Sequence, residues 1–226
     1  MERTRERPLP AGRLRPRDAI LFATVLAVVG VAGLAARFNA LAGLFALSTL
    51  ASYTLVYTPL KRLSTFNTVV GAIPGAMPPL IGFVAVAGRP EGWGWLLFGI
   101  LFAWQFPHFM AIAWLYREDY ARAGMRMLPS LPGHEGLAGR QALAFSLVLI
   151  CVSLLPGVRG LAGPVYVAGA LLLGLAYAGA SAAFALRETR ARARAVLLVS
   201  LFYLPLLFSL VLLDPVVRLA ASSTLP

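Results

Sequence analysis

Seven uninterrupted apolar stretches constrain the fold of this chain more than any other feature of its sequence. Each is close to the roughly 20 residues that an α-helix needs to cross the hydrocarbon core of a bilayer. A membrane β-barrel would need alternating apolar and polar residues, which the stretches lack, and backbone groups in lipid must be satisfied within their own segment. The sequence therefore predicts an all-α fold, a polytopic membrane helical bundle with seven transmembrane helices. The stretches are Ala19–Ala36, Ala40–Tyr57, Thr65–Ala87, Trp93–Tyr116, Ala142–Val158, Gly163–Leu186 and Ala195–Leu213.

The composition points to the same class. Hydrophobic residues make up 59% of the 226 residues and charged residues only 13%, whereas a typical soluble domain carries about 25% charged residues. These values exclude an ordinary water-soluble domain, a disordered chain and a coiled coil. The single cysteine, Cys151, excludes a disulfide scaffold.

The positions of the basic residues predict how the helices are oriented, because cytoplasmic loops of membrane proteins are enriched in Lys and Arg. With a cytoplasmic N-terminus, sixteen of the 20 basic residues fall in the inside segments 1–18, 58–64, 117–141 and 187–194. We therefore expect a multi-pass protein of the cell (inner or plasma) membrane, with its C-terminus outside. A net charge of +11 would suggest nucleic acid in a soluble protein. Here the arginines gather at helix ends, so we expect the bilayer and no nucleic acid as a partner.

The chain is expected to form one integral-membrane domain over residues 1–226. Residues 1–18 form a basic cytoplasmic arm, which by itself is typical of a contact with anionic lipids. Residues 117–141 form the longest hydrophilic loop, also expected in the cytoplasm.

Polar residues near the end of the second span form a first candidate site. Lys61 is the only lysine of the chain, and it follows Tyr57 and precedes Asn67 at the start of the third span. The structural alternative is a lysine that extends its ammonium group to the lipid headgroups.

A second candidate site lies near the middle of the fourth span, where Gln105 and His108 flank Pro107. Polar side chains at this depth are costly unless they are partnered, and they are frequently functional. The structural alternative is a proline kink with a histidine that a neighbouring helix satisfies.

A third candidate site opens the hydrophilic loop, where Glu118 and Asp119 precede Arg122 and Arg126. Mg²⁺ prefers one or two carboxylates together with substrate phosphates, and arginine binds phosphate oxygens in a bidentate fork. The pattern favours a site for Mg²⁺ and diphosphate. The alternative is a solvated loop with internal ion pairs.

Several of these segments, in this order, resemble the UbiA superfamily of intramembrane prenyltransferases. The resemblance runs from Met1 to about Pro132, and the last three spans match only in their hydropathy. Within the superfamily, the Trp-Gln-x-Pro-His-Phe and Asp-Tyr-x-x-Ala-Gly motifs are specific to the branch that modifies haem. The matching segments are Met1–Pro10, Tyr57–Arg62 with Asn67, Gly71–Gly82, Trp104–Phe109 and Asp119–Pro129.

The resemblance implies transfer of a farnesyl group from farnesyl diphosphate to a vinyl group of haem B, with Mg²⁺ bound to the diphosphate. It also implies a haem A synthase as a partner. The implied diphosphate ligands are Arg3, Lys61, Arg62, Asn67 and Arg122. Lys61, Asp119 and Tyr57 are the implied catalytic residues, Asp119 as a ligand of Mg²⁺ and Tyr57 through its ring. Gln105 and His108 are the implied haem contacts, with His108 as a candidate iron ligand.

Two alternative functions stay open. A member of the superfamily with an aromatic or quinone-precursor acceptor should carry a second paired-aspartate motif, and no acid occurs in the four residues after Asp119. A transporter or a non-catalytic membrane subunit would show no dependence on an allylic diphosphate.

The family pattern has nine transmembrane helices, and its first aspartate motif, Asn-x-x-x-Asp-x-x-x-Asp, lies immediately before the segment that matches Met1–Pro10. We therefore expect this sequence to lack the first two family helices and the main Mg²⁺-binding aspartates. Purified residues 1–226 should then show little farnesyl transfer from labelled farnesyl diphosphate to haem B. Substantial transfer by this purified polypeptide would contradict the expectation.

Overall fold

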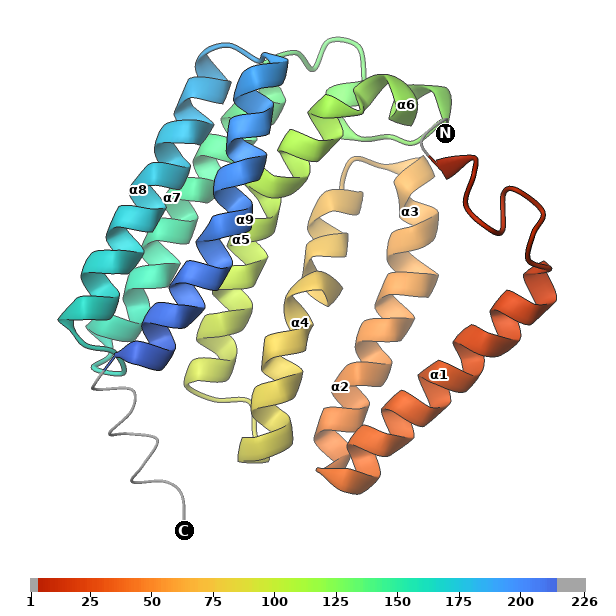
Figure 1. Ribbon diagram of the computed structural model, residues 1–226, viewed down its shortest axis with the longest axis horizontal. Coiled ribbons are helices and arrows are strands. Elements are labelled where there is room, and N and C mark those ends of the chain that lie inside the picture. The colour runs from red at the N-terminus through yellow and green to blue at the C-terminus, as the bar shows by residue number, and fades with distance from the viewer. Residues whose placement is uncertain (1–3, 215–226) are drawn as a thin grey trace.

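The structure, a computed structural model, describes residues 4–214, and every regular element within this range is helical (Figure 1). Seven spans in this part of the chain are long and apolar enough to cross a membrane, which confirms the predicted all-α membrane bundle. The single-helix spans are α1 (Pro16–Arg37), α4 (Asn67–Ala87), α5 (Trp93–Leu115), α7 (Leu137–Val158), α8 (Pro164–Leu186) and α9 (Arg190–Leu213).

The second span changes its helical form along its length. It consists of α2 (Ala40–Ala51), a π-helical turn (Ser52–Tyr57) and α3 (Thr58–Leu63). In the π-helical turn the Thr58 N–H donates to the Tyr53 carbonyl, and the Thr58 hydroxyl donates to the same carbonyl at 2.9 Å. Pro59 is the second residue of α3, in the first turn of that helix, where a proline is tolerated. The span therefore ends at Leu63 and not at Tyr57 as predicted.

The loop predicted over 117–141 is shorter and more ordered than expected. It contains the short helix α6 (Arg117–Arg122) and a 3₁₀ turn (Leu128–Ser130), and α7 begins at Leu137 instead of Ala142. Gly136 adopts a φ of 79° just before α7, a conformation that glycine tolerates without a steric penalty. Helix α9 likewise begins at Arg190 instead of Ala195, because Thr189 accepts a hydrogen bond from the Arg192 N–H at 3.4 Å.

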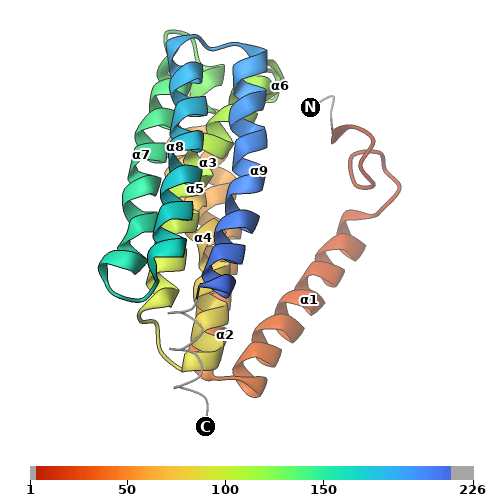
Figure 2. The same cartoon turned by 60° about the vertical axis from the view of Figure 1, so that its left-hand side comes forward.

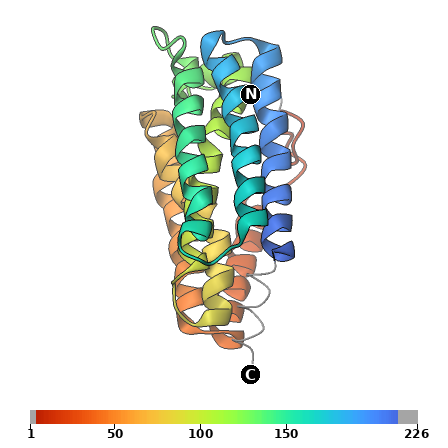
Figure 3. The same cartoon turned by 90° about the vertical axis from the view of Figure 1, so that its left-hand side faces the viewer.

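Within residues 4–214, helices α5, α7, α8 and α9 surround the larger apolar core, and Figure 3 shows α7, α8 and α9 side by side. Helix α5 also packs against α4, and so joins this four-helix group to the first half of the chain. Large side chains with at most 1% exposure fill the core, among them Met110, Leu149, Tyr166, Phe184 and Tyr203.

Helix α1 packs chiefly against α2, and none of its residues is buried. Figure 2 shows its N-terminal half leaning away from the other helices. Its C-terminal end is held more closely, because Asn39 caps α2 through the Ala42 N–H at 2.9 Å and donates to the Val84 carbonyl of α4 at 2.8 Å. Helix α1 is therefore anchored at the end from which α2 begins.

Candidate functional site

Most of the candidate residues lie at one end of the bundle, where α3, α6 and the first turns of α7 and α9 lie (Figure 1). We call this the α6 end. Arg3 lies outside the described residues, and Gln105 and His108 lie deeper, within α5.

The π-helical turn brings aromatic rings to the ammonium group of Lys61. The Lys61 Nζ lies 4.2 Å from the centroid of the Tyr57 ring and 5.9 Å from that of Tyr53, and the two rings lie 5.1 Å apart. A cation over an aromatic face is attracted by the ring quadrupole. Turns of π-helix inside α-helices are frequent at functional sites. Lys61 is therefore held against the protein and is only half-exposed.

A glycine on α4 makes room for the Tyr57 ring. A Cβ atom placed on Gly71 would lie 2.4 Å from Cε2 of Tyr57, closer than real side chains approach each other. Gly71 therefore lets the Tyr57 ring, over which the Lys61 ammonium group lies, pack directly against α4.

The basic N-terminal arm covers Lys61. A pocket of about 630 Å³, which we call the arm pocket, lies between the arm, α3 and α6. Lys61 and Arg7 supply its basic groups and Tyr120 a phenol ring. Residues lining it are Thr4, Arg7, Pro8, Leu9, Pro10, Leu14, Lys61, Tyr120 and Met125. The structure thus brings together two segments, the arm and the Lys61 region, that the sequence analysis assigned to one diphosphate site.

Asn67 fastens the segment after α6 to the turn between α3 and α4. Its side-chain amide donates to the Arg126 carbonyl at 2.9 Å and to the Ser64 carbonyl at 2.6 Å. The Arg126 N–H in turn donates to the Lys61 carbonyl at 2.8 Å. Asn67 is fully buried, and its Oδ1 atom has no hydrogen-bond partner among the described residues. The structure therefore gives Asn67 a positioning role, while its predicted contact with diphosphate stays a prediction.

Asp119 and Arg122 lie on the other side of α6 from the arm pocket. The Arg122 guanidinium donates to the Asp119 carboxylate at 2.5 Å. Both line a second pocket of about 350 Å³, the α6–α9 pocket, together with Arg117, Glu118 and Arg190. Tyr120 lines the arm pocket, so Asp119 and Tyr120, which are adjacent in α6, line different pockets. Lys61 and Asp119 therefore do not share one pocket, and Arg62 is exposed and lines neither.

Few carboxylates are available for a metal ion at the α6 end. Within residues 4–214, no three His, Cys, Asp or Glu side chains gather into a metal-binding cluster. The Asp119 side chain is 15% exposed and that of Glu118 is 77% exposed. Mg²⁺ needs only one or two protein carboxylates when substrate phosphates supply further oxygens. These two residues therefore fit Mg²⁺ only together with a phosphate-containing substrate.

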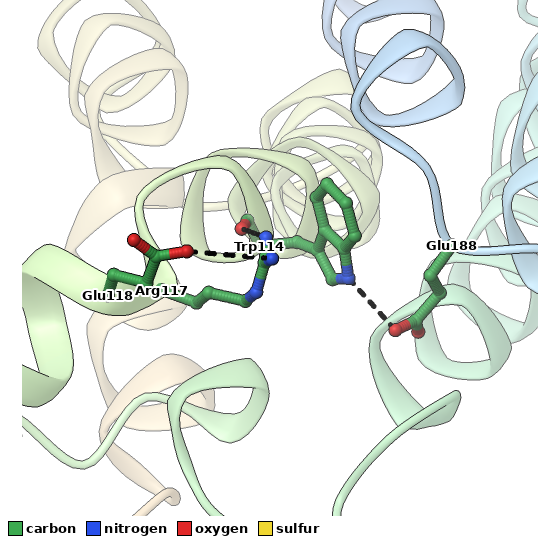
Figure 4. A network of polar contacts seen from close by, with 4 residues as sticks. All are labelled: Trp114, Arg117, Glu118 and Glu188. Atoms are coloured by element: carbon green, nitrogen blue, oxygen red, sulfur yellow. Dashed lines mark hydrogen bonds and ion pairs between the residues drawn. The ribbon is translucent and has the colours of Figure 1, made fainter.

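A network that the sequence analysis missed holds the α6–α9 pocket in shape (Figure 4). The Trp114 indole N–H donates to Glu188 at 3.0 Å, and Glu188 also accepts the Gly139 N–H of α7 at 2.8 Å. The Arg117 guanidinium lies 4.3 Å from the Trp114 ring and donates to the Trp114 carbonyl at 3.1 Å. The one sequence signal for this network is that Glu188 is the single acid in the arginine-rich segment 187–194.

His108 lies in the seam between α5 and α9. Its Nδ1 atom lies 2.7 Å from the Ser200 hydroxyl oxygen, and its ring stacks on Trp104 with centroids 4.7 Å apart. Gln105 points elsewhere, because its amide donates to the Ala72 carbonyl of α4 at 3.0 Å and to the Leu101 carbonyl at 3.1 Å. Gln105 is only 4% exposed and joins α5 to α4. The two predicted haem contacts therefore face different neighbours.

The close fit between Gly71 and Tyr57 generates a testable prediction. Gly71→Ala should lower the thermal stability of the protein, because overpacking of this kind costs about 1–3 kcal/mol. The measurement is the melting temperature in detergent. Gly82→Ala is the matched control, because a Cβ atom there on the same helix meets nothing within 4 Å. Equal melting temperatures for the two variants would contradict the packing described here.

The chain is similar to known prenyltransferases over nearly its whole length. The model of the UbiA prenyltransferase family matches residues 1–210. A Protoheme IX farnesyltransferase of Solibacter usitatus (strain Ellin6076) is 49% identical over 95% of this chain and 73% of that relative. A Protoheme IX farnesyltransferase of Sorangium cellulosum (strain So ce56) is 44% identical over 92% of this chain and 75% of that relative.

The fold is similar to that of a solved structure as well. A structure from work on a Digeranylgeranylglyceryl phosphate synthase in membranes matches with a TM-score of 0.78 over 96% of this chain and 77% of that chain. At 18% identity, this likeness supports the fold alone. The family match over residues 1–210, with the 49% identity to the Solibacter usitatus relative, shows that the chain belongs to the UbiA prenyltransferase family.

Proposed function

We propose that this protein transfers a farnesyl group from farnesyl diphosphate to a vinyl group of haem B. The observation that carries the proposal is the 49% identity to a Protoheme IX farnesyltransferase over 95% of the chain. Basic pockets at the α6 end and a histidine deeper in the bundle are consistent with a donor that carries a diphosphate and an acceptor that carries iron.

The basic groups at the α6 end suit the diphosphate. Lys61 and Arg7 line the arm pocket, and Arg122 lines the α6–α9 pocket across the short helix. We assign Lys61, Arg62 and Arg122 to the diphosphate, with Arg3 as a further ligand from the arm. Because α6 separates Lys61 from Arg122 and Asp119 in this structure, the assignment requires α6 to shift when the diphosphate binds. Charge-assisted hydrogen bonds from such groups stabilise phosphate oxygens more strongly than neutral donors do.

Asp119, with Glu118 beside it, is the residue that we assign to Mg²⁺. When bound, Mg²⁺ neutralises the negative charge that develops on the departing diphosphate. The basic side chains assigned to the diphosphate act in the same direction. Fixed cations at the place where negative charge develops stabilise the transition state more than the ground state.

The transfer breaks the bond between farnesyl C1 and the diphosphate oxygen, and the electron pair leaves with the diphosphate. Once the Lys61 ammonium group binds the diphosphate, the Tyr57 face over which it lies here at 4.2 Å can attract the allylic cation in the same way. The terminal vinyl carbon of the acceptor then bonds to C1. The cation left beside the pyrrole ring is resolved by addition of water or by loss of a proton, and one proton is released in either case.

His108 is our proposed contact for the acceptor, and we infer a supporting role for Gln105. Gln105 holds α5 to α4 through its amide, one turn before His108. His108 is half-buried in the α5–α9 seam, at a depth where the surrounding helices are apolar. This placement suits contact with a large apolar ring system.

The distribution of basic residues supports a cytoplasmic N-terminus and α6 end, with the C-terminus outside, in the cell (inner) membrane. The basic pockets would then open toward the cytoplasm. The family resemblance suggests a haem A synthase as the protein that receives the product.

The proposal is tested in membranes that contain the protein expressed from its native locus. Labelled farnesyl diphosphate should label haem B and not 4-hydroxybenzoate, and the transfer should require Mg²⁺. Transfer to 4-hydroxybenzoate with none to haem B would contradict the proposed acceptor.

Asp119→Asn should reduce this turnover by about 10²-fold or more, while the amount of protein in the membrane changes little. The physical reason is that the amide removes the negative oxygen that we assign to Mg²⁺, and losing one group that stabilises developing charge typically costs this much. Glu135→Gln, which changes an exposed acid in the same loop, is the control. Unchanged turnover in Asp119→Asn would remove this residue from the site.

A further inference from the structure

A closed set of polar groups crosses the seam between α5 and α9 around His108. The Trp104 indole N–H donates to the Ser200 carbonyl at 2.9 Å, and the Tyr177 hydroxyl of α8 donates to the Trp104 carbonyl at 3.3 Å. The Ser200 hydroxyl donates to the Leu197 carbonyl at 2.6 Å. The Tyr177 hydroxyl also lies within hydrogen-bonding reach of the Ser200 side chain, which can accept from it through a lone pair.

This count of donors assigns the proton of the His108 ring. A serine hydroxyl has one proton and two lone pairs. The Leu197 carbonyl can only accept, so its 2.6 Å distance from the Ser200 oxygen assigns the hydroxyl proton to that bond. The Ser200 oxygen is then the acceptor toward His108 Nδ1, 2.7 Å away. In the neutral ring, Nδ1 then carries the hydrogen and Nε2 carries the lone pair.

We propose that Ser200 is a positioning residue that fixes His108 in the Nδ1–H tautomer, so that Nε2 offers its lone pair to the iron of the acceptor. This inference rests on the proposed function, because that function supplies the iron-containing acceptor. Histidines that bind metals almost always donate their other ring N–H to a fixed acceptor, which sets the tautomer and the orientation of the ring. Ser200 is fully buried and is held by its own bond to Leu197, so it is such an acceptor.

The ring of Trp104 adds a second constraint on the same histidine. The Trp104 and His108 rings stack at 21° with centroids 4.7 Å apart, and the Trp104 indole is itself bound to the backbone of Ser200. Ser200 therefore acts on His108 in two ways. Its hydroxyl sets the tautomer, and its carbonyl holds the Trp104 indole, which in turn sets the plane of the His108 ring. In the span interiors of residues 4–214, His108 is the one side chain among His, Asp and Glu.

The tautomer can be measured directly by ¹⁵N NMR of the protein with labelled histidine, at a pH at which the ring is neutral. The chain has two histidines, and His134→Gln identifies the signals of His108. We expect a protonated Nδ1 and an unprotonated Nε2 in the wild type. Ser200→Ala should shift the population toward Nε2–H, and Ser200→Thr should restore the wild-type pattern because it keeps the hydroxyl.

Ser209→Ala is the matched control, because Ser209 is on the same helix, is exposed and bonds only to its own helix at Pro205. It should leave the His108 signals unchanged. A wild type with Nε2–H, or a Ser200→Ala variant with unchanged signals, would overturn the assignment of the tautomer.

The consequence for the acceptor is measured by titrating haem B into the solubilised His134→Gln protein and following the visible absorption of the iron. The absorption band of bound haem that is lost in the His108→Ala variant is the band that reports ligation of the iron by His108. Ser200→Ala should weaken this binding by about 10–100-fold, as is typical when the partner of a metal-binding histidine is removed, and Ser200→Thr and Ser209→Ala should bind as the wild type does.

The two proposals fail differently in this titration. A normal wild-type band with unchanged affinity in Ser200→Ala overturns the positioning role of Ser200 alone. A wild type without a band that depends on His108 overturns the assignment of His108 to the acceptor, and with it the role of Ser200 toward iron.

Discussion

Hydrogen bonds between the segment after α6 and the turn between α3 and α4 are the interactions on which the α6 end depends. The Arg126 N–H reaches the Lys61 carbonyl, its guanidinium reaches the Leu63 carbonyl, and Asn67 reaches the Arg126 carbonyl. These bonds join the second span to the connection between α5 and α7. They thereby place Lys61 beside α6, and both basic pockets follow from the position of that helix.

The sequence predicted the spans well, because the length of an apolar run is a direct physical requirement of the bilayer. It also grouped Tyr57 and Lys61 in one candidate site, but it did not predict that the ammonium group lies over the Tyr57 ring. It did not predict that Asp119 and Tyr120 line different pockets, or that α7 and α9 begin before their apolar runs. The start of α9 follows from the local cap at Thr189. The other features depend on tertiary contacts such as the one between Glu188 and Gly139, which leave no periodic pattern in the sequence.

The polar residues of the two candidate regions are organised in different ways. At the α6 end the charged side chains are partly exposed, and ion pairs such as Arg122 with Asp119 can exchange for a ligand. In the α5–α9 seam the buried Ser200 holds Nδ1 of the half-buried His108, and the Trp104 indole is bonded to the Ser200 carbonyl, as expected where an unpaired group is costly. The first arrangement suits a charged donor that arrives and leaves, and the second suits exact placement of one ring.

Binding of an unreactive farnesyl diphosphate analogue is the most direct test of the central claim, that the pocket around Lys61 holds the diphosphate. Lys61→Met should weaken binding by about tenfold or more, because a hydrogen bond to a charged group contributes roughly 1.5–3 kcal/mol. Arg89→Met, which removes an exposed arginine from the loop before α5, should bind as the wild type does. Equal affinities for the wild type and Lys61→Met would contradict the claim.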